Sequence, residues 1–376
     1  MLKREVVIVG GGPSGLSAAI ETAKNGAEVL LIDENLRAGG QLFKQIHKFF
    51  GSSAHHSGTR GIEIGAQLLK EAEKYGVETW LNSVVVGLFR EKKLAVEKKK
   101  ADGSSKLEEI KADKIVLATG ASENAISFKG WTLPGVMGAG AAQTMANIHR
   151  VLPGERILMI GSGNVGLIVS YQLLQAGAEV IGIVEAAPGV GGYGVHAAKI
   201  RRAGVPIYTS HTILEARGKE EVEEAVIAEV DADWQPVAGT EKVLKVDTIA
   251  IAAGLKPLLE LATMHGCKCS FVPQLGGWVP LHNQKMESTV EGIYIVGDAT
   301  GVEEANTALE EGRLAGISIA ESCGYLSTME AEENRQTILK RLTGLRLGSF
   351  GEGRLKAKEA ICKEYERVTG GGQNDD

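Results

Sequence analysis

The sequence has few cysteines, no long apolar run and no apparent leader segment. Its four cysteines, Cys267, Cys269, Cys323 and Cys362, are too few and too scattered to form a disulfide scaffold in a chain of 376 residues. No apolar run approaches the ~18 residues of a membrane-spanning helix. The first expected strand starts within five residues of Met1, which leaves no room for a cleavable signal segment. We therefore expect a cytoplasmic protein without a membrane span.

An excess of basic residues is also missing. The 41 lysines and arginines are outnumbered by 47 aspartates and glutamates, for a formal charge of −6. Such a chain offers no basic surface for phosphate backbones, so nucleic acid is not an expected partner. A hydrophobic content of 44% is ordinary for a globular protein. Because single cores rarely exceed ~250 residues, we expect at least two domains.

One long motif is present, and it occurs twice. Residues 6–34 read VVIVGGGPSGLSAAIETAKNGAEVLLIDE, and residues 157–185 read ILMIGSGNVGLIVSYQLLQAGAEVIGIVE, aligned without a gap. Each copy has an apolar, strand-like run, a G-x-G-x-x-G cluster, a helical pattern and a second apolar run. The predicted fold class is therefore α/β, with two Rossmann-like dinucleotide-binding domains.

The glycines of the first copy suit a bound pyrophosphate. Gly10 permits the tight turn, Gly12 lets the phosphates approach the backbone, and Gly15 lets helix and strand pack closely. The helix N-terminus then points at the phosphates. Asp33 ends the second strand, where a carboxylate binds ribose hydroxyls, and Glu34 adjoins it. A glycine turn without a ligand is the alternative, but the strand, helix and acid together favour the dinucleotide.

The second copy keeps the three glycines, but its acid is displaced. Val184 stands at the position equivalent to Asp33, and Glu185 follows one residue later. This leaves open whether Glu185 contacts a ribose or only ends a solvated strand.

The same acid bears on the choice of cofactor. A carboxylate repels a 2′-phosphate, and the AAPGVGGYG segment after Glu185 contains no Arg or Lys, so the sequence favours NADH over NADPH. Arg201 and Arg202 are the alternative source of a phosphate ligand.

Three further stretches distinguish a flavoprotein from a simple dehydrogenase. RAGGQL at residues 37–42 follows the first acid, and KIVLATG at residues 114–120 is echoed by TIAIAAGLKP at residues 248–257. GIYIVGDATG at residues 292–301 places Asp298 in a turn before a helix expected over residues 303–322. With these motifs the chain, from residue 4 to about 323, resembles the two-dinucleotide flavoproteins that include thioredoxin reductase and glutathione reductase.

The resemblance implies that FAD occupies the first site and NAD the second. Asp298 would bind the ribitol chain, with a turn or capping role as the alternative. The helix near Glu303 would direct its positive end, around Asn306 and Thr307, at the flavin pyrimidine. The candidate FAD-binding residues are Gly10, Gly12, Pro13, Ser14, Gly15, Asp33, Glu34, Gly40, Gln41, Thr119, Gly120, Gly297, Asp298, Asn306 and Thr307. The candidate NAD-binding residues are Gly161, Gly163, Asn164, Val165, Gly166, Glu185 and Gly254.

The expected domains follow from this order of motifs. Residues 1–125 and 270–330 form a discontinuous FAD-binding domain, and residues 126–269 form an inserted NAD-binding domain. Residues 331–376 form a charged helical tail that packs on the protein or binds a partner.

The redox dithiol of many of these flavoproteins is missing. Thioredoxin reductase relatives carry C-x-x-C just before the second glycine motif, where residues 134–145 contain no cysteine. Glutathione reductase relatives carry their pair after the first GG, and residues 41–80 contain none. We therefore do not expect disulfide reduction. Cys267 and Cys269 could supply at most half of the ligands of a metal site. Incidental surface cysteines are the preferred interpretation, and no metal is expected.

Within the superfamily the chain most resembles the flavin- and NAD-binding subunits of sarcosine oxidase, opine oxidase, hydrogen cyanide synthase and dye-linked proline dehydrogenase. Residues 133–145, 191–207 and 275–280 carry this resemblance. Larger relatives continue into a cysteine-rich iron–sulfur domain, which this tail lacks. The resemblance thus implies two partners, a flavoprotein that oxidises an amine or amino acid and a small iron–sulfur protein.

Hydride transfer between nicotinamide and flavin needs no acid, base or nucleophile from the protein, so no catalytic residue is predicted. A structural role is favoured for each histidine, although Lys44 and His47, after the GGQL segment, are placed to overhang a flavin. The predicted function is FAD-dependent electron transfer with NAD(H), as a subunit of an amine or amino-acid dehydrogenase or oxidase. The alternatives are a stand-alone NADH oxidase or diaphorase, using oxygen or quinone, and a non-catalytic assembly protein with a degenerate second site.

Overall fold

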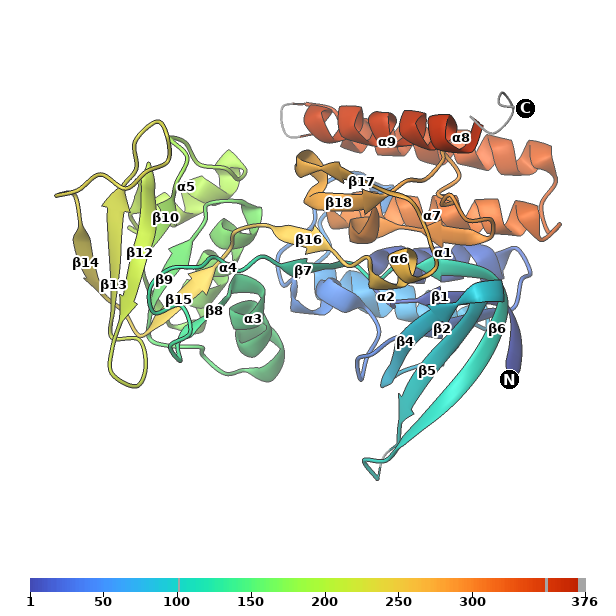
Figure 1. Cartoon of the computed structure of the whole chain (residues 1–376), viewed down its shortest axis with the longest axis horizontal. Coiled ribbons are helices and arrows are strands. Elements are labelled where there is room, and N and C mark those ends of the chain that lie inside the picture. Colours follow the sequence, from blue (N-terminus) through green and yellow to red (C-terminus); the bar gives the residue numbers. More distant parts are fainter. Residues whose placement is uncertain (101, 349–350, 371–376) are drawn as a thin grey trace. The chain divides into compact units, whose positions relative to one another are not determined.

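The computed structural model describes residues 1–100, 102–348 and 351–370, and these form two compact units (Figure 1). Unit 1 comprises Met1–Ser122 and Lys256–Asp376, and unit 2 comprises Glu123–Leu255. The chain passes between the units through β7 (Ala121–Glu123) and β16 (Leu255–Pro257), which pair as a two-stranded sheet. Of the predicted tail, residues 349–350 and 371–376 lie outside the described residues.

Unit 1 is built on a mainly parallel sheet. Its strands, in spatial order, are β3 (Glu78–Trp80), β2 (Val29–Ile32), β1 (Leu2–Val9), β6 (Ser105–Leu117), β5 (Lys93–Lys99) and β4 (Ser83–Phe89), with β19 (Ile293–Ile295) beside the end of β6. β6 is long enough to serve two partners on one side. Its first half pairs with β5 in antiparallel fashion, and its last residues pair with β19 in parallel.

Both faces of this sheet are covered, which explains the apolar run in β1. Val6 and Ile8 pack into the core shared with the helices α1 (Pro13–Lys24), α2 (Gly61–Lys74) and α7 (Ala305–Ser322). Val7 and Val9 pack into the core on the opposite face, with β4, β5 and the short α6 (Glu260–Met264). The strand is therefore buried at every second position on each side.

Unit 2 repeats this plan with different helices. Its parallel sheet, in spatial order, contains β11 (Ile207–Thr209), β10 (Glu179–Glu185), β9 (Arg156–Ile160), β15 (Thr248–Ile251) and β8 (Val136–Gly138). Helices cover one face, and they are α3 (Ala139–Thr144), the π-helical turn Met145–His149, α4 (Asn164–Ala176) and α5 (Gly194–Arg202). An antiparallel meander covers the other face, and its strands are β12 (His211–Arg217), β13 (Glu224–Glu229) and β14 (Lys242–Lys245). The predicted α/β fold with two Rossmann-like sheets is confirmed.

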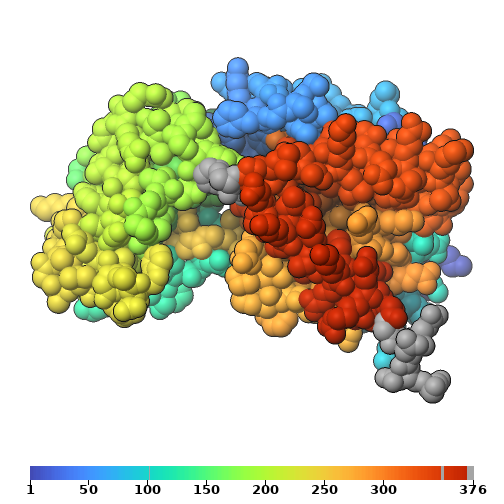
Figure 2. Space-filling view, turned by 90° about the horizontal axis from the view of Figure 1, so that it is seen from above, coloured from blue at the N-terminus to red at the C-terminus, as the bar shows by residue number. Residues whose placement is uncertain are grey.

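The remaining elements belong to unit 1. They are the 3₁₀ turns Gly40–Lys44, Ser53–His55, Arg90–Lys92, Pro273–Leu275 and Gly297–Thr300, the hairpin β17 (Cys269–Val272) and β18 (Gly277–Pro280), and the tail helices α8 (Thr328–Leu345) and α9 (Glu352–Gly370). Figure 2 shows these tail helices, in red, lying across the orange segments of the same unit. None of the helices in the described part of the chain combines the length and apolar character needed to cross a bilayer.

Glycines allow α1 and α7 to approach each other closely. A Cβ atom on Gly312 of α7 would overlap the main-chain oxygen of Ser14 in α1. Gly316, one turn later, faces α1 in the same way, since its Cβ would lie 2.7 Å from the Cβ of Glu21. By contrast, a Cβ on Gly344 of α8 would meet no atom within 4 Å.

We expect Gly312→Ala and Gly344→Ala to change stability in opposite directions. The first should lower the free energy of unfolding by about 1–3 kcal/mol, because the added methyl group forces α1 and α7 apart. The matched variant should raise it by up to about 1 kcal/mol, because alanine favours the helix and has free space. Urea denaturation followed by circular dichroism measures both values. Equal effects of the two substitutions would contradict close packing at Gly312.

Candidate functional site

In the first glycine loop, Gly10 and Gly15 leave no room for a side chain, whereas the middle glycine, Gly12, does. Gly10 has a φ of +101°, and a Cβ there would overlap the main-chain oxygen of Ala118. A Cβ on Gly15 would overlap the oxygen of Gly10, so α1 packs directly on the loop. A Cβ on Gly12, the N-cap of α1, would meet no atom within 4 Å. The loop thus leaves space in front of the helix N-terminus, where an anion is favoured.

Of the two acids after β2, only Asp33 contacts this loop. Asp33 is 5% exposed, and its Oδ2 accepts the main-chain N–H of Gly11 at 2.6 Å. Its Oδ1 accepts the main-chain N–H of Asn35 at 2.8 Å. Glu34 is exposed. Asp33 therefore fixes the loop against the strand end.

The second glycine loop has the same construction. Gly161 has a φ of +103°, and its Cβ would overlap the main-chain oxygen of Ala252. A Cβ on Gly166 would overlap the oxygen of Gly161, while one on Gly163 would meet no atom within 4 Å. In both units, therefore, only the middle glycine of the loop, in front of α1 or α4, leaves space for a ligand.

A β-bulge restores the position of the second acid. Val180 pairs with Ile157, but Gly182 pairs with Leu158, so Ile181 is an extra residue in β10. Beyond the bulge, Glu185 Oε2 accepts the main-chain N–H of Ser162 at 2.9 Å and its hydroxyl at 2.6 Å. Ser162 occupies the place that Gly11 has in the first loop. Glu185 is thus the structural counterpart of Asp33, despite its displacement by one residue in the sequence.

The other motifs of unit 1 gather around the first loop. Because β1, β6 and β19 run parallel, the segments that follow them meet at one edge of the sheet. A Cβ on Gly40 would lie 2.9 Å from the Cα of Gly12, and one on Gly297 would overlap the hydroxyl of Ser14. Thr119 Oγ1 donates to the carbonyl of Leu258 at 2.9 Å.

Several candidates serve as loop or helix-end residues around these contacts. Gly120 and Gly254 have φ values of +76° and +85°, which favour glycine. Gln41 is exposed, and Pro13 and Val165 lie in the first turns of α1 and α4. Asn164 Oδ1 accepts the main-chain N–H of Tyr193 at 2.8 Å, which ties the segment before α5 to the second loop.

Asp298 and the N-terminus of α7 follow β19, at the same edge of the sheet as the first glycine loop. Burial raises the pKa of Asp298 to about 6, and its Oδ1 accepts the N–H of Glu303 at 3.3 Å. Asn306 Nδ2 donates to the carbonyl of Phe50 at 2.8 Å, but its Oδ1 is buried without a partner in the described part of the chain. Thr307 Oγ1 donates to the carbonyl of Glu304 at 2.6 Å. Asn306 therefore offers a buried acceptor that no described protein group uses.

The tail helices reach this site through a buried ionic cluster, which no motif in the sequence predicts. Glu311 Oε2 accepts the main-chain N–H of Gly297 and the hydroxyl of Thr300, both at 3.0 Å. Its Oε1 accepts from Lys358 of α9 at 2.8 Å and from Arg346 at 2.6 Å. Burial opposes ionisation of Glu311, but the two cations outweigh it and lower the pKa to about 2. The tail therefore packs on unit 1 directly behind the turn that holds Asp298.

A second buried cluster involves a histidine. His55 is 3% exposed, and its ring nitrogens lie 3.0 Å from Ser52 Oγ and 3.0 Å from Glu310 Oε1. Arg341 of α8 binds the same carboxylate at 2.8 Å. His47, one of the two residues suggested to overhang a flavin, stacks with Phe49 at 5.7 Å between ring centroids.

Burial favours the protonated thiol form of all four cysteines. Burial raises the pKa of Cys267, and burial with the nearby Cys267 raises that of Cys269 to about 11. Burial likewise raises the pKa of Cys323 and Cys362. Among the residues with described positions, no group of three or more His, Cys, Asp or Glu side chains is arranged to hold a metal ion.

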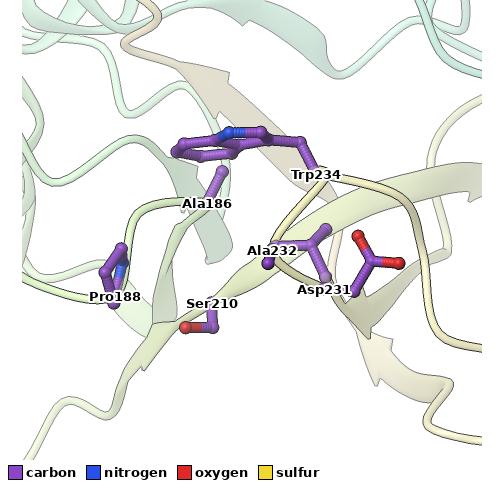
Figure 3. Close-up of a pocket in the computed structure, with 7 residues that line it drawn as sticks. Ala186, Pro188, Ser210, Asp231, Ala232 and Trp234 are labelled. Carbon is purple, nitrogen blue, oxygen red and sulfur yellow. The ribbon is translucent and has the colours of Figure 1, made fainter.

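Unit 2 carries a hollow of about 310 Å³ next to its acid (Figure 3). Ala186 and Pro188 line it from the segment after β10, and Ser210 lines it from the end of β11. Asp231 and Trp234 line it from the loop after β13. The hollow therefore lies at the carboxyl edge of the parallel sheet.

Comparison with known proteins assigns the chain to a family. The sequence pattern of the pyridine nucleotide-disulphide oxidoreductases matches residues 4–312. The chain belongs to this family. Membership makes it an oxidoreductase of flavoprotein type and implies FAD and a pyridine nucleotide as cofactors.

The curated relatives that match most of the chain are components of larger enzymes. Hydrogen cyanide synthase subunit HcnB of Pseudomonas aeruginosa is 28% identical, over 96% of this chain and 80% of that protein. An opine oxidase subunit of Agrobacterium tumefaciens is 27% identical, over 86% of this chain and 67% of that protein. The alpha subunit of sarcosine oxidase from a Corynebacterium species is 26% identical over 85% of this chain, which spans 33% of that larger protein. The resemblance inferred from the sequence is confirmed.

Solved structures show the shared fold. L-proline dehydrogenase from P. horikoshii superposes with a TM-score of 0.68 at 23% identity, over 91% of this chain and 59% of that chain. Thioredoxin reductase from T. acidophilum gives 0.67 at 21% identity, over 86% of this chain and 99% of that chain.

We expect Lys358→Met to destabilise unit 1 by about 3 kcal/mol, because it removes one of the two cations that compensate the buried Glu311. Lys356→Met, which removes an exposed charge from the same helix, should change stability by less than about 0.5 kcal/mol. Urea denaturation measures both differences.

The pH dependence of the unfolding free energy tests whether Glu311 is ionised. The pKa of Glu311 in the folded protein lies below its unfolded value of 4.5. The contribution of Glu311 to the free energy of unfolding is therefore present above pH 4.5 and is lost as the pH falls towards about 2. The difference between wild type and Lys358→Met should therefore shrink below pH 4.5. A constant difference over this range would argue against an ionised Glu311.

Proposed function

We propose that unit 1 binds FAD, that unit 2 binds NAD(H), and that the protein passes electron pairs between NAD(H) and a partner subunit that oxidises an amine or amino acid. The observation that carries this proposal is the duplicated site. Each unit has a glycine loop that is open only at its middle glycine, and each holds a carboxylate against that loop. Two complete sites of this kind fit two dinucleotides better than one dinucleotide and an assembly surface.

The residues of unit 1 fit FAD. The open position at Gly12 suits the pyrophosphate, and the Asp33 carboxylate suits the adenosine ribose. Asp298 is an acceptor for a ribitol hydroxyl, and Asn306 Oδ1 is an acceptor suited to the N–H of the flavin pyrimidine. The positive end of α7 favours the negative charge that a reduced flavin carries. When bound, FAD supplies the redox chemistry.

The residues of unit 2 favour NAD(H) over NADP(H). Glu185 places a carboxylate against the loop beside the expected ribose, Asp231 lines the adjoining hollow, and the residues that line this hollow include no Lys or Arg. Arg201 lies near the end of α5, while the segment before α5 is tied to the second loop. At about 1.5 Å per residue, Arg201 is roughly 10 Å along the helix from Gly194. It is therefore poorly placed for a 2′-phosphate.

The missing dithiol supports an external electron partner. Residues 41–80 and 134–145, where related reductases carry their cysteine pairs, have none. The curated relatives are each named as subunits of oxidases or of hydrogen cyanide synthase. We infer that the partners include an amine- or amino-acid-oxidising flavoprotein and a small iron–sulfur protein.

Anaerobic mixing of the purified flavoprotein with NADH tests the proposal. The absorbance of the oxidised flavin should be lost, and only slow NADH consumption should follow when oxygen is admitted. Flavin that stays oxidised at excess NADH would reject electron transfer and favour an assembly role. Fast continuous turnover with oxygen or quinone by the isolated chain would favour the stand-alone oxidase or diaphorase.

Two glycine variants separate the two sites. We expect Gly12→Ala to abolish FAD retention, because its methyl group fills the space for the pyrophosphate without touching the protein. Gly163→Ala should retain FAD but weaken NADH binding at least about 10-fold, measured by titrating the flavin absorbance. Gly189→Ala, which also adds a methyl group in open space, is the control. If Gly163→Ala reacts with NADH as the wild type does, NADH does not use this loop.

Ala186→Arg tests the nucleotide preference. The new guanidinium stands beside the expected 2′ position, so NADPH should gain about 10-fold in apparent affinity relative to NADH. Ala203→Arg adds the same charge at the exposed end of α5 and should leave the ratio unchanged. Flavin reduction at varied NADH and NADPH concentrations gives the ratio, and an equal shift in both variants would show a non-specific effect of charge.

A further inference from the structure

In unit 1, residues 50–55 are tied to two positions of α7 that lie one helical turn apart. Asn306 Nδ2 donates to the carbonyl of Phe50 at 2.8 Å. Glu310, four residues later on the same face of the helix, contacts His55 at 3.0 Å. Between these ties Gly51 has a φ of +116°, and a Cβ there would lie 3.2 Å from Asn306 Nδ2 and 3.4 Å from the Cβ of His55. The backbone therefore turns tightly against α7 between the two contacts.

The tie to Phe50 fixes which end of the Asn306 amide is available to a ligand. A main-chain carbonyl can only accept a hydrogen bond, so the NH₂ end of the amide faces Phe50 and Oδ1 is directed elsewhere. Oδ1 is buried and has no partner in the described part of the chain. Such an unpaired acceptor is unfavourable, and a donor from a bound ligand accounts for it. With the amide turned over, its NH₂ group would replace Oδ1 and could not pair with another N–H.

The tie to Glu310 is part of a buried ionic cluster that extends to the tail. The Glu310 carboxylate is fully buried and binds Arg313 of α7 and Arg341 of α8. Burial opposes ionisation, but the hydrogen bond from His55 and the two cations outweigh it, so the pKa of Glu310 lies below its usual value. Because a carboxylate only accepts, the Nε2–H of His55 donates to Glu310, and Nδ1 contacts the hydroxyl of Ser52 at 3.0 Å. Both ring nitrogens thus hold His55 in one orientation.

We infer that His55 and Glu310 position Asn306 so that its Oδ1 accepts the pyrimidine N–H of a flavin bound in unit 1. This role rests on the proposed function, because it requires FAD in unit 1. His55 holds the turn at Gly51, and this turn holds the carbonyl of Phe50 against the NH₂ end of the amide. His55 and Glu310 are therefore positioning residues that act on the flavin through Asn306. The competing explanation is that the pair only secures α8 on unit 1.

A double-mutant cycle on FAD affinity tests this role. The full chain, freed of flavin, is titrated with FAD while the quenching of flavin fluorescence is followed. Asn306→Ala should weaken binding by about 3- to 10-fold, because one hydrogen bond is lost. His55→Ala should have a similar effect alone, but less than about 2-fold in the Asn306→Ala background, where no amide remains to be positioned. His55→Gln, which can still donate to Glu310, should keep most of the affinity. If the effects of His55→Ala and Asn306→Ala multiply, the positioning role is overturned.

Nuclear magnetic resonance of ¹⁵N-labelled FAD gives a readout that a loss of stability alone does not move. The signal of the pyrimidine N–H of bound flavin should shift in the same direction in His55→Ala and Asn306→Ala. Arg335→Met is the matched control, because buried Arg335 also joins α8 to a glutamate of α7, Glu321, at 3.0 Å. At about 1.5 Å per residue, Glu321 is roughly 22 Å along α7 from Asn306. The control should lower stability and leave both the signal and the FAD affinity unchanged.

The outcomes separate this role from the proposed function. If the wild type does not bind FAD, the proposed function fails as well. If the wild type binds FAD and NADH reduces it, but Asn306→Ala changes neither the affinity nor the signal, only the role of His55 and Glu310 is overturned. An equal change in Arg335→Met would also overturn it, because any loosening of α8 would then suffice. If His55→Ala does not fold, Arg341→Met takes its place in the cycle, since the Arg341 side chain is 31% exposed.

Discussion

The contact between a glycine loop and the neighbouring strand is the constraint on which both units depend. At Gly10 and Gly161 the backbone lies against Ala118 and Ala252, so closely that any side chain would overlap it. This contact brings the first turn of the following helix to the carboxyl edge of the sheet. The helix N-terminus, the carboxylate and the motifs after the neighbouring strands therefore meet at one place, and the open middle glycine faces that place.

Much of this arrangement could be predicted from the sequence, because the residues that close the loop are local. The glycine spacing, the apolar runs and the acids at their ends fall within about 30 residues of one another, so their geometry follows from βαβ rules. The repeat then predicted the second unit. The same method left the role of the acid of unit 2 open, because an alignment without gaps cannot show that Ile181 bulges out of β10. The extra residue in β10 moves Glu185 one place along the sequence but leaves it at the same place in the fold as Asp33.

Features that join distant segments could not be predicted. Glu311 and Lys358 are separated by 47 positions, and neither belongs to a recognisable motif. Trp234 lies in the loop between β13 and β14, whose path towards Ala186 depends on how the meander packs on the sheet. In both cases the sequence supplies suitable side chains, but tertiary packing decides which of them meet. The buried pairing at Glu311 also shows why the tail cannot be treated as a separate appendage.

The position of Lys358 has a consequence for the order in which the protein matures. Glu311 holds the main-chain N–H of Gly297, and it is buried with the ammonium group of a helix near the C-terminal end of the described chain. Without that helix, Arg346 alone is left to compensate the buried carboxylate. During synthesis on the ribosome, the turn that carries Asp298 therefore lacks its final support until α9 has been made. If FAD occupies unit 1 as proposed, the turn beside it gains its full support only when this helix has been made, even though the first glycine loop is among the first segments to emerge.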